Sequence, residues 1–312
     1  MSIIVLDFDG TITQNDTIDV LGKFACSRNG GAVIWDDIVK AYFADHKSHV
    51  ATYQPEQALR TTLDQELAFL ESLRPVELAS AERVVRAALF RDLTDSDFER
   101  FGREAFGNGL RGGRLEPETS SGGGSSSSLP TASPAVTLRA GFRTFVDEVA
   151  SRTDSSLGLV SVNWSQSFIE GVLGGEGKDK EDRFIKRVNR ITAPTGVIEG
   201  PAELAGATLV TAQDKVDALR ELLGQDQAGG ERQTCCVYIG DSTTDLACLM
   251  EASLGIVMAD NEDSRLLQTL GRLGYDVPHV SVWKAPEKLA WARDFDEILK
   301  SRIIDSTKDI PQ

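Results

Sequence analysis

Residues 3–11 read Ile-Ile-Val-Leu-Asp-Phe-Asp-Gly-Thr, and this stretch decides the fold. The four apolar residues predict a short buried strand that runs directly into two carboxylates, Asp7 and Asp9, and a glycine. Two like charges held this close raise the cost of ionising both, unless a cation or a proton lies between them. Mg²⁺ is a hard ion that takes one or two carboxylates and keeps its waters for a phosphorylated substrate. The stretch therefore indicates a metal-assisted site for phosphoryl transfer.

Two other interpretations of the same stretch have to be weighed. Asp and Gly are ordinary turn residues, so a strand end followed by an Asx turn would also explain it. A calcium-binding loop does not fit, because the required glycine and the closing glutamate would fall on Ile12 and Ile18 when counted from Asp7. The choice depends on whether other strand ends supply further parts of a phosphoryl site.

The composition narrows the class of protein. The chain has 312 residues, with 33 Lys and Arg against 48 Asp and Glu, and a formal net charge of -15. This length holds one large domain or two moderate ones with a sizeable core. An acidic protein lacks the basic footprint of a nucleic-acid-binding protein. It also repels anionic substrates at long range, so any phosphate site needs local positive charge.

Other features of the sequence predict the cellular compartment. The start of the chain lacks a basic region and a long apolar run, so no secretory signal is expected there. No run approaches the roughly 18 apolar residues of a membrane span, and we expect no membrane contact. The cysteines form no C-x-x-C pair and most resemble small core residues. We therefore expect a soluble, cytoplasmic protein. The cysteines are Cys26, Cys235, Cys236 and Cys248.

The first third of the chain has a helical pattern. Leu59, Leu63, Leu67 and Leu70 recur at helical spacing, and Ser96 with Glu99 forms a candidate capping box for another helix. Residues 117–135 are a Gly/Ser/Pro-rich tract that cannot bury a core, which predicts a flexible loop.

After this tract the pattern changes to apolar strands separated by helices, which is typical of a parallel sheet covered on both faces. The expected fold is α/β, a three-layer Rossmann-like core formed by residues 1–14 and 136–312. Residues 15–116 form an inserted α-helical cap domain beside the site. Expected helices are 142–149, 213–224 and 243–252, and expected strands are 157–162, 184–191, 235–239, 254–258 and 277–282.

Three later positions fit a phosphoryl site. Ser161 closes an apolar run, and its hydroxyl suits phosphate oxygens, although a plain helix cap is the commoner explanation for such a serine taken alone. Lys215 lies early in a predicted helix, where a lone lysine is usually solvated. Gly240-Asp241-Ser242-Thr243-Thr244-Asp245 follows a second buried strand and again places carboxylates at a strand end.

Taken in order, D-x-D-G-T, a strand-end serine, a lysine and G-D-S-x-x-D resemble the four motifs of the haloacid dehalogenase (HAD) superfamily. The helical insertion after the first motif resembles the cap of the phosphoserine-phosphatase-like branch. The motifs span about 1–14 and 136–290, and the cap is matched only by its position and its helicity.

The resemblance implies a role for each motif residue. Asp7 is the expected nucleophile, and it forms an aspartyl-phosphate. Asp9 is the expected general acid and then the general base. Ser161 and Lys215 bind the transferring phosphoryl oxygens. The Mg²⁺ ligands are expected to be Asp7, the backbone carbonyl of Asp9 and Asp241, with Asp245 as support or as a further ligand.

Several more residues are candidates for substrate contact. Gly10 and Thr11 belong to the first motif. The three residues after Val162 follow Ser161 closely and are expected in the wall of the pocket, with packing in the core as the alternative for Trp164. These three are Asn163, Trp164 and Ser165.

Other polar residues remain ambiguous. Asp16 and Thr17 either face the substrate or begin the first helix of the insertion. His46 and His49 are three residues apart in a helical stretch, but no third metal ligand is evident, so a position on the helix surface is the commoner explanation.

The expected function is a Mg²⁺-dependent phosphatase acting on a small phosphorylated metabolite. The second aspartate of the motif, Asp9, favours an oxygen leaving group, because the departure of a halide needs no acid. A phosphomutase of the same architecture is the first alternative. A non-catalytic binding protein that keeps the fold is the second, and it is disfavoured because every motif position retains usable chemistry.

Overall fold

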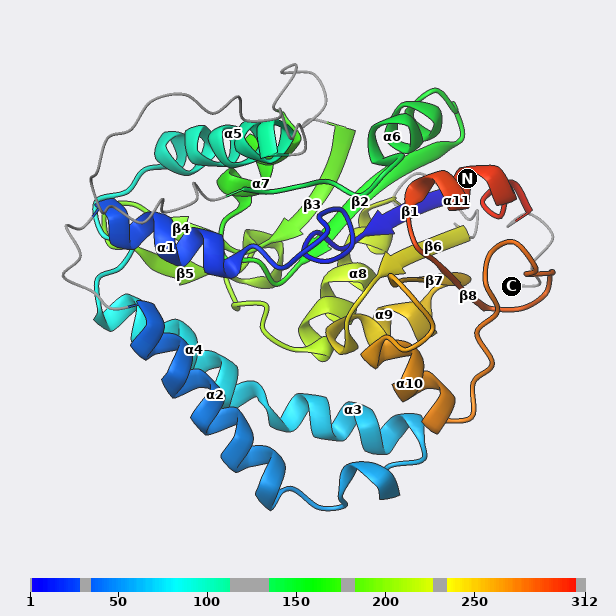
Figure 1. Cartoon of the computed structure of the whole chain (residues 1–312), viewed down its shortest axis with the longest axis horizontal. Helices are drawn as coiled ribbons and strands as arrows, with labels where there is room; N and C mark the ends of the chain where they lie inside the picture. The colour runs from blue at the N-terminus through cyan, green and yellow to red at the C-terminus, as the bar shows by residue number, and fades with distance from the viewer. Residues whose placement is uncertain (1, 29–34, 113–134, 175–182, 227–234, 307–312) are drawn as a thin grey trace, which may run out of the picture.

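The computed structural model describes residues 2–28, 35–112, 135–174, 183–226 and 235–306. A six-stranded sheet with the order β3-β2-β1-β6-β7-β8 forms its centre (Figure 1). Every pair of neighbouring strands is parallel. The strands are β1 (Ser2–Leu6), β2 (Ser155–Ser161), β3 (Phe184–Val188), β6 (Cys235–Gly240), β7 (Leu254–Met258) and β8 (Leu289–Ala292).

The central position of β1 follows from its sequence. Residues 3–6 are completely buried, so the strand needs cover on both faces and a neighbour on each side. In the observed register Leu6 lies opposite both Leu159 of β2 and Ile239 of β6. The residues that follow these three strands therefore emerge together at one edge of the sheet, as ligand sites do in open α/β folds.

Two layers of helices cover the sheet. On one face Ile4 and Leu6 pack with helices α6 (Phe142–Ala150), α7 (Gln166–Leu173) and α11 (Phe295–Ser301). On the other face Ile3 and Val5 pack with α8 (Ala212–Asp226), α9 (Leu246–Glu251) and α10 (Arg265–Arg272). The alternation of side chains along β1 thus feeds two separate cores, and the expected three-layer α/β fold is confirmed.

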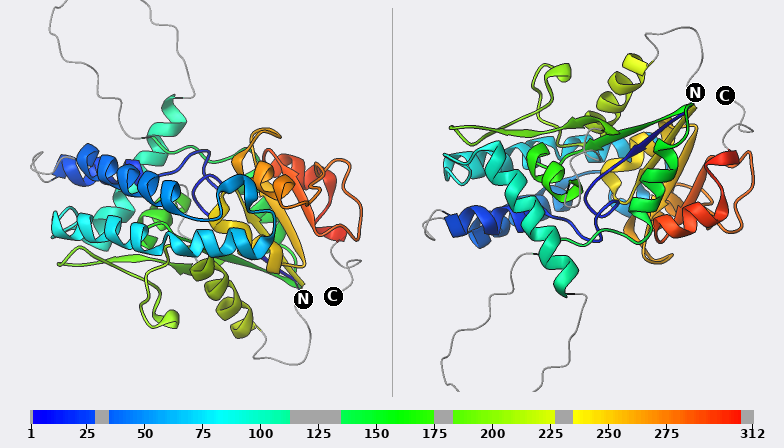
Figure 2. Two further views of the ribbon diagram at one scale, coloured as in Figure 1. Left: turned by 90° about the horizontal axis from the view of Figure 1, so that it is seen from below. Right: turned by 90° about the horizontal axis from the view of Figure 1, so that it is seen from above.

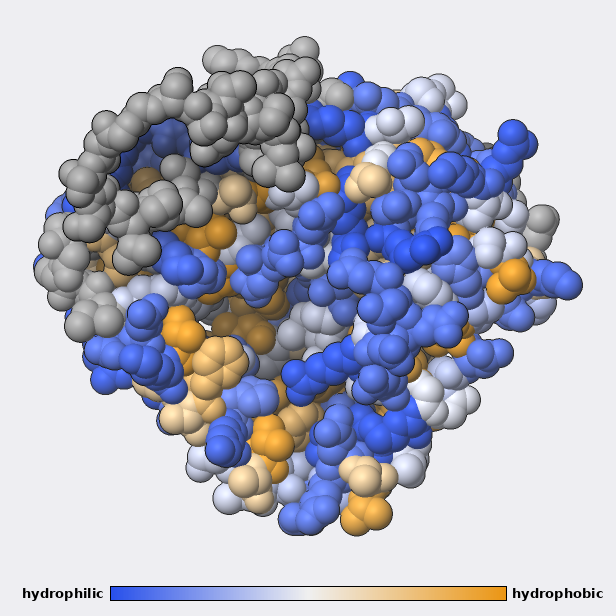
Figure 3. Space-filling model, viewed as in Figure 1, coloured by the Kyte–Doolittle hydropathy of each residue, from blue (hydrophilic) through white to orange (hydrophobic). Residues whose placement is uncertain are grey.

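Between β1 and α6 the described regular elements are helical, apart from an isolated bridge between Thr13 and Leu138. We call this part the helical insertion. The surface is hollowed between the insertion and the sheet domain (Figure 3). The views from below and above show the insertion arching past one end of the sheet (Figure 2). Its helices are α1 (Ile18–Arg28), α2 (Trp35–Thr52), η1 (Gln57–Leu59), α3 (Leu63–Ser72), α4 (Arg74–Arg86) and α5 (Asp95–Gly112).

Helix α5 packs tightly against α7 of the core. Gly102 and Gly171 lie at the contact, and a Cβ on Gly102 would lie 2.3 Å from the carbonyl oxygen of Phe168. A Cβ on Gly171 would lie 2.0 Å from the carbonyl oxygen of Glu99. These two glycines allow the helix backbones to approach each other more closely than any side chain would permit.

The sheet differs from the sequence prediction in two places. The expected strand 184–191 ends at Val188, because Asn189 turns its side chain to the backbone of Val162 and Leu209. The chain then forms an antiparallel pair, β4 (Arg190–Thr192) and β5 (Val197–Glu199), outside the main sheet.

The expected strand 277–282 is wrong. Pro278 has no backbone donor, and the segment makes only one isolated bridge, between His279 and Trp291. The edge strand is instead β8, whose four residues are all buried. Two alanines among four residues gave this strand little signal in the sequence.

Two helix starts were also misplaced. Leu59 lies in the short 3-10 helix and is 63% exposed, because a capping box between Thr62 and Gln65 starts α3 at Leu63. The reciprocal hydrogen bonds at the start of α5 join Thr94 and Asp97 rather than Ser96 and Glu99. The predicted flexible tract 117–135 lies outside the described residues, except for residue 135.

Within the described part of the chain, no helix is both long enough and apolar enough to cross a membrane.

Candidate active site

The ends of β1 and β6 and the start of α8 bring Asp7, Asp241 and Lys215 together. Asp7 follows β1, and its backbone N–H donates to the carbonyl of Ile239 at 3.0 Å. The ammonium group of Lys215 lies 3.0 Å from Oδ1 of Asp7, and both side chains are buried. A buried lysine needs a charged partner. Lys215 is therefore not the solvated surface lysine that its sequence context would suggest.

Asp245 organises this end of the sheet. Its Oδ1 accepts hydrogen bonds from Lys215 and from the phenol of Tyr238, both at 2.7 Å. Its Oδ2 accepts from the backbone N–H groups of Asp241 and Ser242 and from the Ser242 hydroxyl. With both oxygens engaged by the protein, Asp245 supports the site by fixing its neighbours.

Asp241 lies against the first motif. Its Oδ1 accepts a hydrogen bond of 3.0 Å from the Thr11 hydroxyl. Gly10 has a φ of +72°, and a Cβ there would lie 2.2 Å from Oδ2 of Asp241. Both the left-handed backbone and the close approach require glycine. Gly10 and Thr11 thus position a carboxylate, and the structure gives no separate indication of substrate contact for them.

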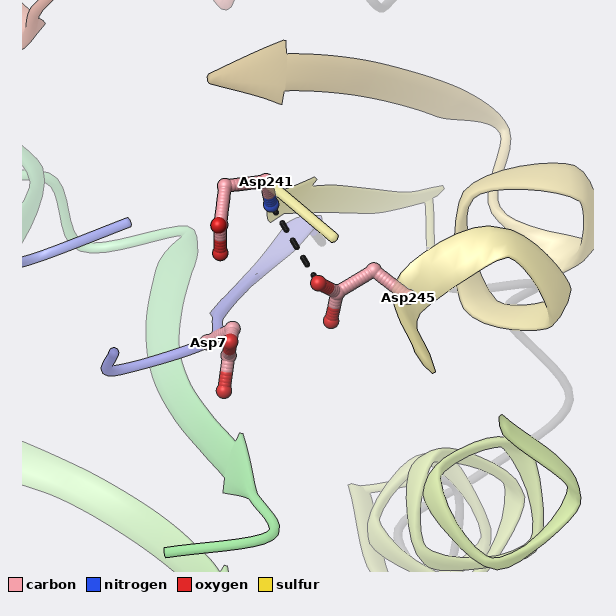
Figure 4. A group of neighbouring side chains, drawn as sticks. All are labelled: Asp7, Asp241 and Asp245. Carbon is pink, nitrogen blue, oxygen red and sulfur yellow. Dashed lines mark hydrogen bonds between the residues drawn. The ribbon is translucent and has the colours of Figure 1, made fainter. Parts of the chain in front are cut away.

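Asp7, Asp241 and Asp245 form an acidic cluster whose potential ligand atoms all lie within 4.8 Å of one another (Figure 4). Oδ1 of Asp7 is buried and accepts no hydrogen bond of good geometry. Burial, with Asp245 and Asp7 nearby, raises the pKa of Asp241 well above its ordinary value. Burial likewise raises the pKa of Asp7 to about 6, against the opposing effect of Lys215.

A hard divalent cation fits this donor set. Carboxylate oxygens are the ligands that Mg²⁺ prefers, and a cation would remove the repulsion that the raised pKa values reflect. Lys215 alone does not supply enough charge, because it is shared between Asp7 and Asp245. For Lys215 itself, burial acts to lower the pKa, but the two carboxylates outweigh it and raise the pKa.

Asp9 lies apart from this cluster and faces the helical insertion. Its Oδ1 accepts from the backbone N–H and the hydroxyl of Thr17, at 2.9 and 2.6 Å. Its Oδ2 accepts from Nδ2 of Asn163 at 2.7 Å. Burial and the neighbouring Asp16 raise the pKa of Asp9 to about 7, although Thr17 and Asn163 counteract them. A carboxyl group with such a pKa exchanges a proton readily at neutral pH.

The segment after β2 is less uniform than predicted. Ser161 is buried at the strand end, and its Oγ accepts the backbone N–H of Asn163 at 3.2 Å. Ser165 caps α7 by accepting the N–H of Phe168, and Trp164 packs edge-on against Trp35 and Phe90. The side chains of Ser165 and Trp164 therefore serve the fold, whereas Asn163 reaches Asp9.

Three contributors escaped the sequence analysis or were left ambiguous by it. Tyr238 looked like an ordinary residue of a buried strand, and only its phenol distinguished it. Thr17 was assigned equally to the substrate and to the helix start, and the structure shows it bonded to Asp9. Arg139 donates to the carbonyl of Gly10 at 2.9 Å and to the carboxylate of Asp260 at 2.6 Å. No motif marked Arg139, because it lies in the segment that leads from the helical insertion back to α6, far from Gly10 in sequence.

The parallel sheet, with Asp7 after β1, Ser161 at the end of β2, Asp241 after β6 and Lys215 at the start of α8, agrees with the haloacid dehalogenase (HAD) type of fold that the motifs resemble. Its helical insertion follows the first motif, as in the phosphoserine-phosphatase-like arrangement that the resemblance predicted.

The chain is similar to two fungal proteins. It is 24% identical to Cold tolerance protein 1 of Saccharomyces cerevisiae, over 93% of this chain and 90% of that protein. It is 26% identical to a CTO1 family protein of Schizosaccharomyces pombe, over 83% of this chain and 82% of that protein. No model of a known protein family matches the chain.

Similar solved structures include phosphoserine phosphatases. One contains an analogue of the phospho-aspartyl intermediate and is 17% identical, covering 96% of this chain and 97% of that one, with a TM-score of 0.46. A substrate-bound complex is 16% identical, covers 96% and 97%, and has a TM-score of 0.48. Because the TM-scores are below 0.5, the function proposed below rests on the residues of this chain.

Proposed function

We propose that this protein is a Mg²⁺-dependent phosphatase that hydrolyses a small phosphorylated metabolite through an aspartyl-phosphate on Asp7. One observation carries the proposal. Asp7 is a buried carboxylate at the carboxyl end of the central strand, 3.0 Å from Lys215 and in one acidic cluster with Asp241. An arrangement that serves only stability would have little reason to gather two buried carboxylates and a half-buried third around a single lysine.

The charges of the site match the demands of phosphoryl transfer. Two unit charges about 4 Å apart repel by about 4 kcal/mol at an effective dielectric constant near 20. A phosphate dianion that approaches Asp7 meets roughly twice this repulsion. Lys215 and one divalent cation carry enough positive charge to offset it, whereas the Ser161 hydroxyl can only orient a phosphoryl oxygen. A Mg²⁺ held by Asp7, Asp241 and the carbonyl of Asp9 would supply this charge compensation.

In the first step an oxygen of Asp7 attacks the phosphorus atom, and the bond from phosphorus to the ester oxygen breaks. Asp9 donates its proton to the departing alcohol oxygen. Lys215 and Ser161 hold the phosphoryl oxygens during the transfer. The products of this step are the free alcohol and an acyl phosphate on Asp7.

In the second step water attacks the same phosphorus atom, and the bond to Asp7 breaks. Asp9 is now ionised and accepts a proton from the water. Thr17 and Asn163 keep the Asp9 carboxyl group in place for both steps through the three hydrogen bonds described above. The second step releases inorganic phosphate and restores Asp7.

The test is a screen of phosphomonoesters with Mg²⁺, comparing the parent protein with Asp7→Asn. We expect the parent to release inorganic phosphate from at least one substrate, and the variant to be folded and at least about a thousandfold slower, equivalent to about 4 kcal/mol. Phosphate release by Asp7→Asn at the parental rate would remove Asp7 as the nucleophile. Transfer to an added sugar phosphate without phosphate release would favour the phosphomutase.

A further inference from the structure

A cavity of about 170 Å³ lies between the helical insertion and the core. The insertion contributes Tyr42 and His46 from α2 and Arg60 from the segment before α3. The core side includes Thr243 and Arg265. This cavity lies close to the candidate active site, because its lining includes residues three and four positions before Lys215 and two and three positions after Asp241, namely Thr211, Ala212, Thr243 and Thr244.

Most of the charge on the cavity wall is neutralised within the protein. Arg60 donates to Glu66 at 2.8 Å and stacks on the ring of Phe69, 3.9 Å from its centroid. Arg272 also pairs with Glu66, at 3.0 Å, so this carboxylate is already shared by two guanidinium groups. Glu77 accepts a hydrogen bond of 2.9 Å from the Tyr42 phenol.

Arg265 differs from these residues. Among the described residues, its guanidinium group makes neither an ion pair nor a hydrogen bond, although it begins α10 at the edge of the cavity. Its charge still acts on the opposite wall. Burial and Arg265 lower the pKa of His46, which leaves this imidazole neutral at neutral pH and able to donate one N–H. The hydroxyl of Thr243 likewise has no hydrogen-bond partner in the described part of the chain.

This combination calls for an anion. A guanidinium group is a rigid fork of donors that matches a carboxylate or a phosphate with two parallel hydrogen bonds. Arg265 is exposed at the rim of the cavity, and because the protein as a whole carries a charge of -15, it is not part of a general basic surface. Its position beside Thr243 places this positive charge on the same cavity as the residues that flank the phosphoryl site.

We propose that Arg265 binds a second oxyanion of the substrate, at the end away from the transferred phosphoryl group. The inference rests on the proposed phosphatase function and names the substrate class within it: phosphomonoesters that carry a carboxylate or a second phosphate. His46 and Thr243 provide further donors on the two walls of the cavity.

The test compares substrates that differ only at the distal group. 3-Phosphoglycerate and glycerol 3-phosphate have the same carbon skeleton, with a carboxylate in one and a neutral hydroxymethyl group in the other. Fructose 1,6-bisphosphate and fructose 6-phosphate test a second phosphate in the same way. We expect the parent to favour the doubly anionic member of at least one pair by tenfold or more in kcat/KM, about what a charge-assisted hydrogen bond provides.

Arg265→Gln should raise KM about tenfold or more for the preferred substrate with a second anionic group. It should leave KM nearly unchanged for the matched substrate whose distal group is neutral. Arg265→Lys keeps the positive charge but loses the forked donor geometry, so its KM for the preferred substrate should lie between those of the parent and Arg265→Gln. Arg190→Gln, in β4 outside the cavity, removes the same charge and should change neither substrate. Equal turnover of both members of each pair, or equal losses for both in Arg265→Gln, would overturn the inference while leaving the phosphatase in place.

Binding separates the two proposals if no turnover is found. With Mg²⁺ and the Asp7→Asn protein, calorimetry should detect tighter binding of the preferred doubly anionic compound than of its neutral partner. The difference should disappear when Arg265→Gln is added. If this pattern appears without any hydrolysis by the parent, the anion site stands and the phosphatase proposal fails. If neither preference appears, the anion site is refuted.

Discussion

The ammonium nitrogen of Lys215 lies 2.7 Å from Oδ1 of Asp245, and neither side chain has any exposed surface. This pair determines the electrostatics of the site. A lysine buried alone would lose its proton, but Asp245 and Asp7 keep it charged beside the attacking oxygen. The same Oδ1 accepts a hydrogen bond from the phenol of Tyr238 in β6. Tyr238 is therefore linked to Asp7 indirectly, through Asp245 and Lys215.

Tyr238→Phe should lower kcat about three- to tenfold with little change in KM. The variant removes one hydrogen bond to a buried carboxylate, which is worth about 1.5–3 kcal/mol, and part of this appears as a misplaced Lys215. Steady-state kinetics and thermal unfolding on the same preparation check the prediction. A loss of melting temperature with unchanged kcat would show that the phenol serves stability alone.

Asp241→Asn should raise the melting temperature of the protein in a chelator by a few degrees at pH 8. The folded pKa of Asp241 is raised, so the folded state keeps a proton that the unfolded chain has already lost. The loss of folding stability caused by Asp241 is therefore absent below about pH 4, grows as the pH rises and is complete above the pKa of Asp241 in the folded state. The difference in melting temperature between variant and parent should grow in the same direction.

Added Mg²⁺ should reverse this order. It should raise the melting temperature of the parent, restore phosphatase activity lost to the chelator, and have little effect on Asp241→Asn. Thermal scans with and without Mg²⁺ give a readout independent of turnover. Equal stabilisation of the two proteins by Mg²⁺ would contradict the metal role of Asp241.

Gly10→Ala should lower kcat at least tenfold and destabilise the protein by about 1–2 kcal/mol. The added methyl would lie 2.2 Å from Oδ2 of Asp241, in a backbone conformation with a φ of +72°. Gly274→Ala is the matched control, because Gly274 has a φ of +86° and no atom within 4 Å of its Cβ position. A similar loss of activity in both variants would attribute the effect to backbone strain.

Gly102→Ala should destabilise the protein by about 1–3 kcal/mol, as overpacking does. The new Cβ would lie 2.3 Å from the carbonyl oxygen of Phe168, so α5 and α7 would have to separate. Gly107→Ala in the same helix meets no atom within 4 Å and should be neutral or slightly stabilising. Denaturant unfolding of both variants measures the difference. Equal stability would show that the helices can shift apart at no cost.

The core of the fold was predictable because its signals are local and redundant. Four consecutive apolar residues specified β1, and a metal site, one of the explanations open for the carboxylates that follow it, also accounts for Asp241. The edge of the sheet was not predictable in the same way. Asn189 ends β3 through partners at Val162 and Leu209, and no pattern around Asn189 shows such distant contacts.

The sequence predicted the site residues that belong to a motif, but not the roles of the residues next to them. Asp7, Asp241 and Lys215 do lie together, as the motifs indicated. Trp164 and Ser165 adjoin the site in sequence, but the chain turns them into packing and capping roles. Whether a residue faces the site or its scaffold depends on the rotation of the backbone after the strand, which composition and spacing do not encode.

The middle position of β1 has a consequence for biosynthesis. This strand leaves the ribosome before its two neighbours in the sheet, which begin at Ser155 and Cys235. Until both have been translated, the apolar segment from Ile3 to Leu6 lacks a partner on at least one edge. The nascent polypeptide therefore carries an aggregation-prone segment until β6 has been translated, and the middle of the sheet can assemble only after that point.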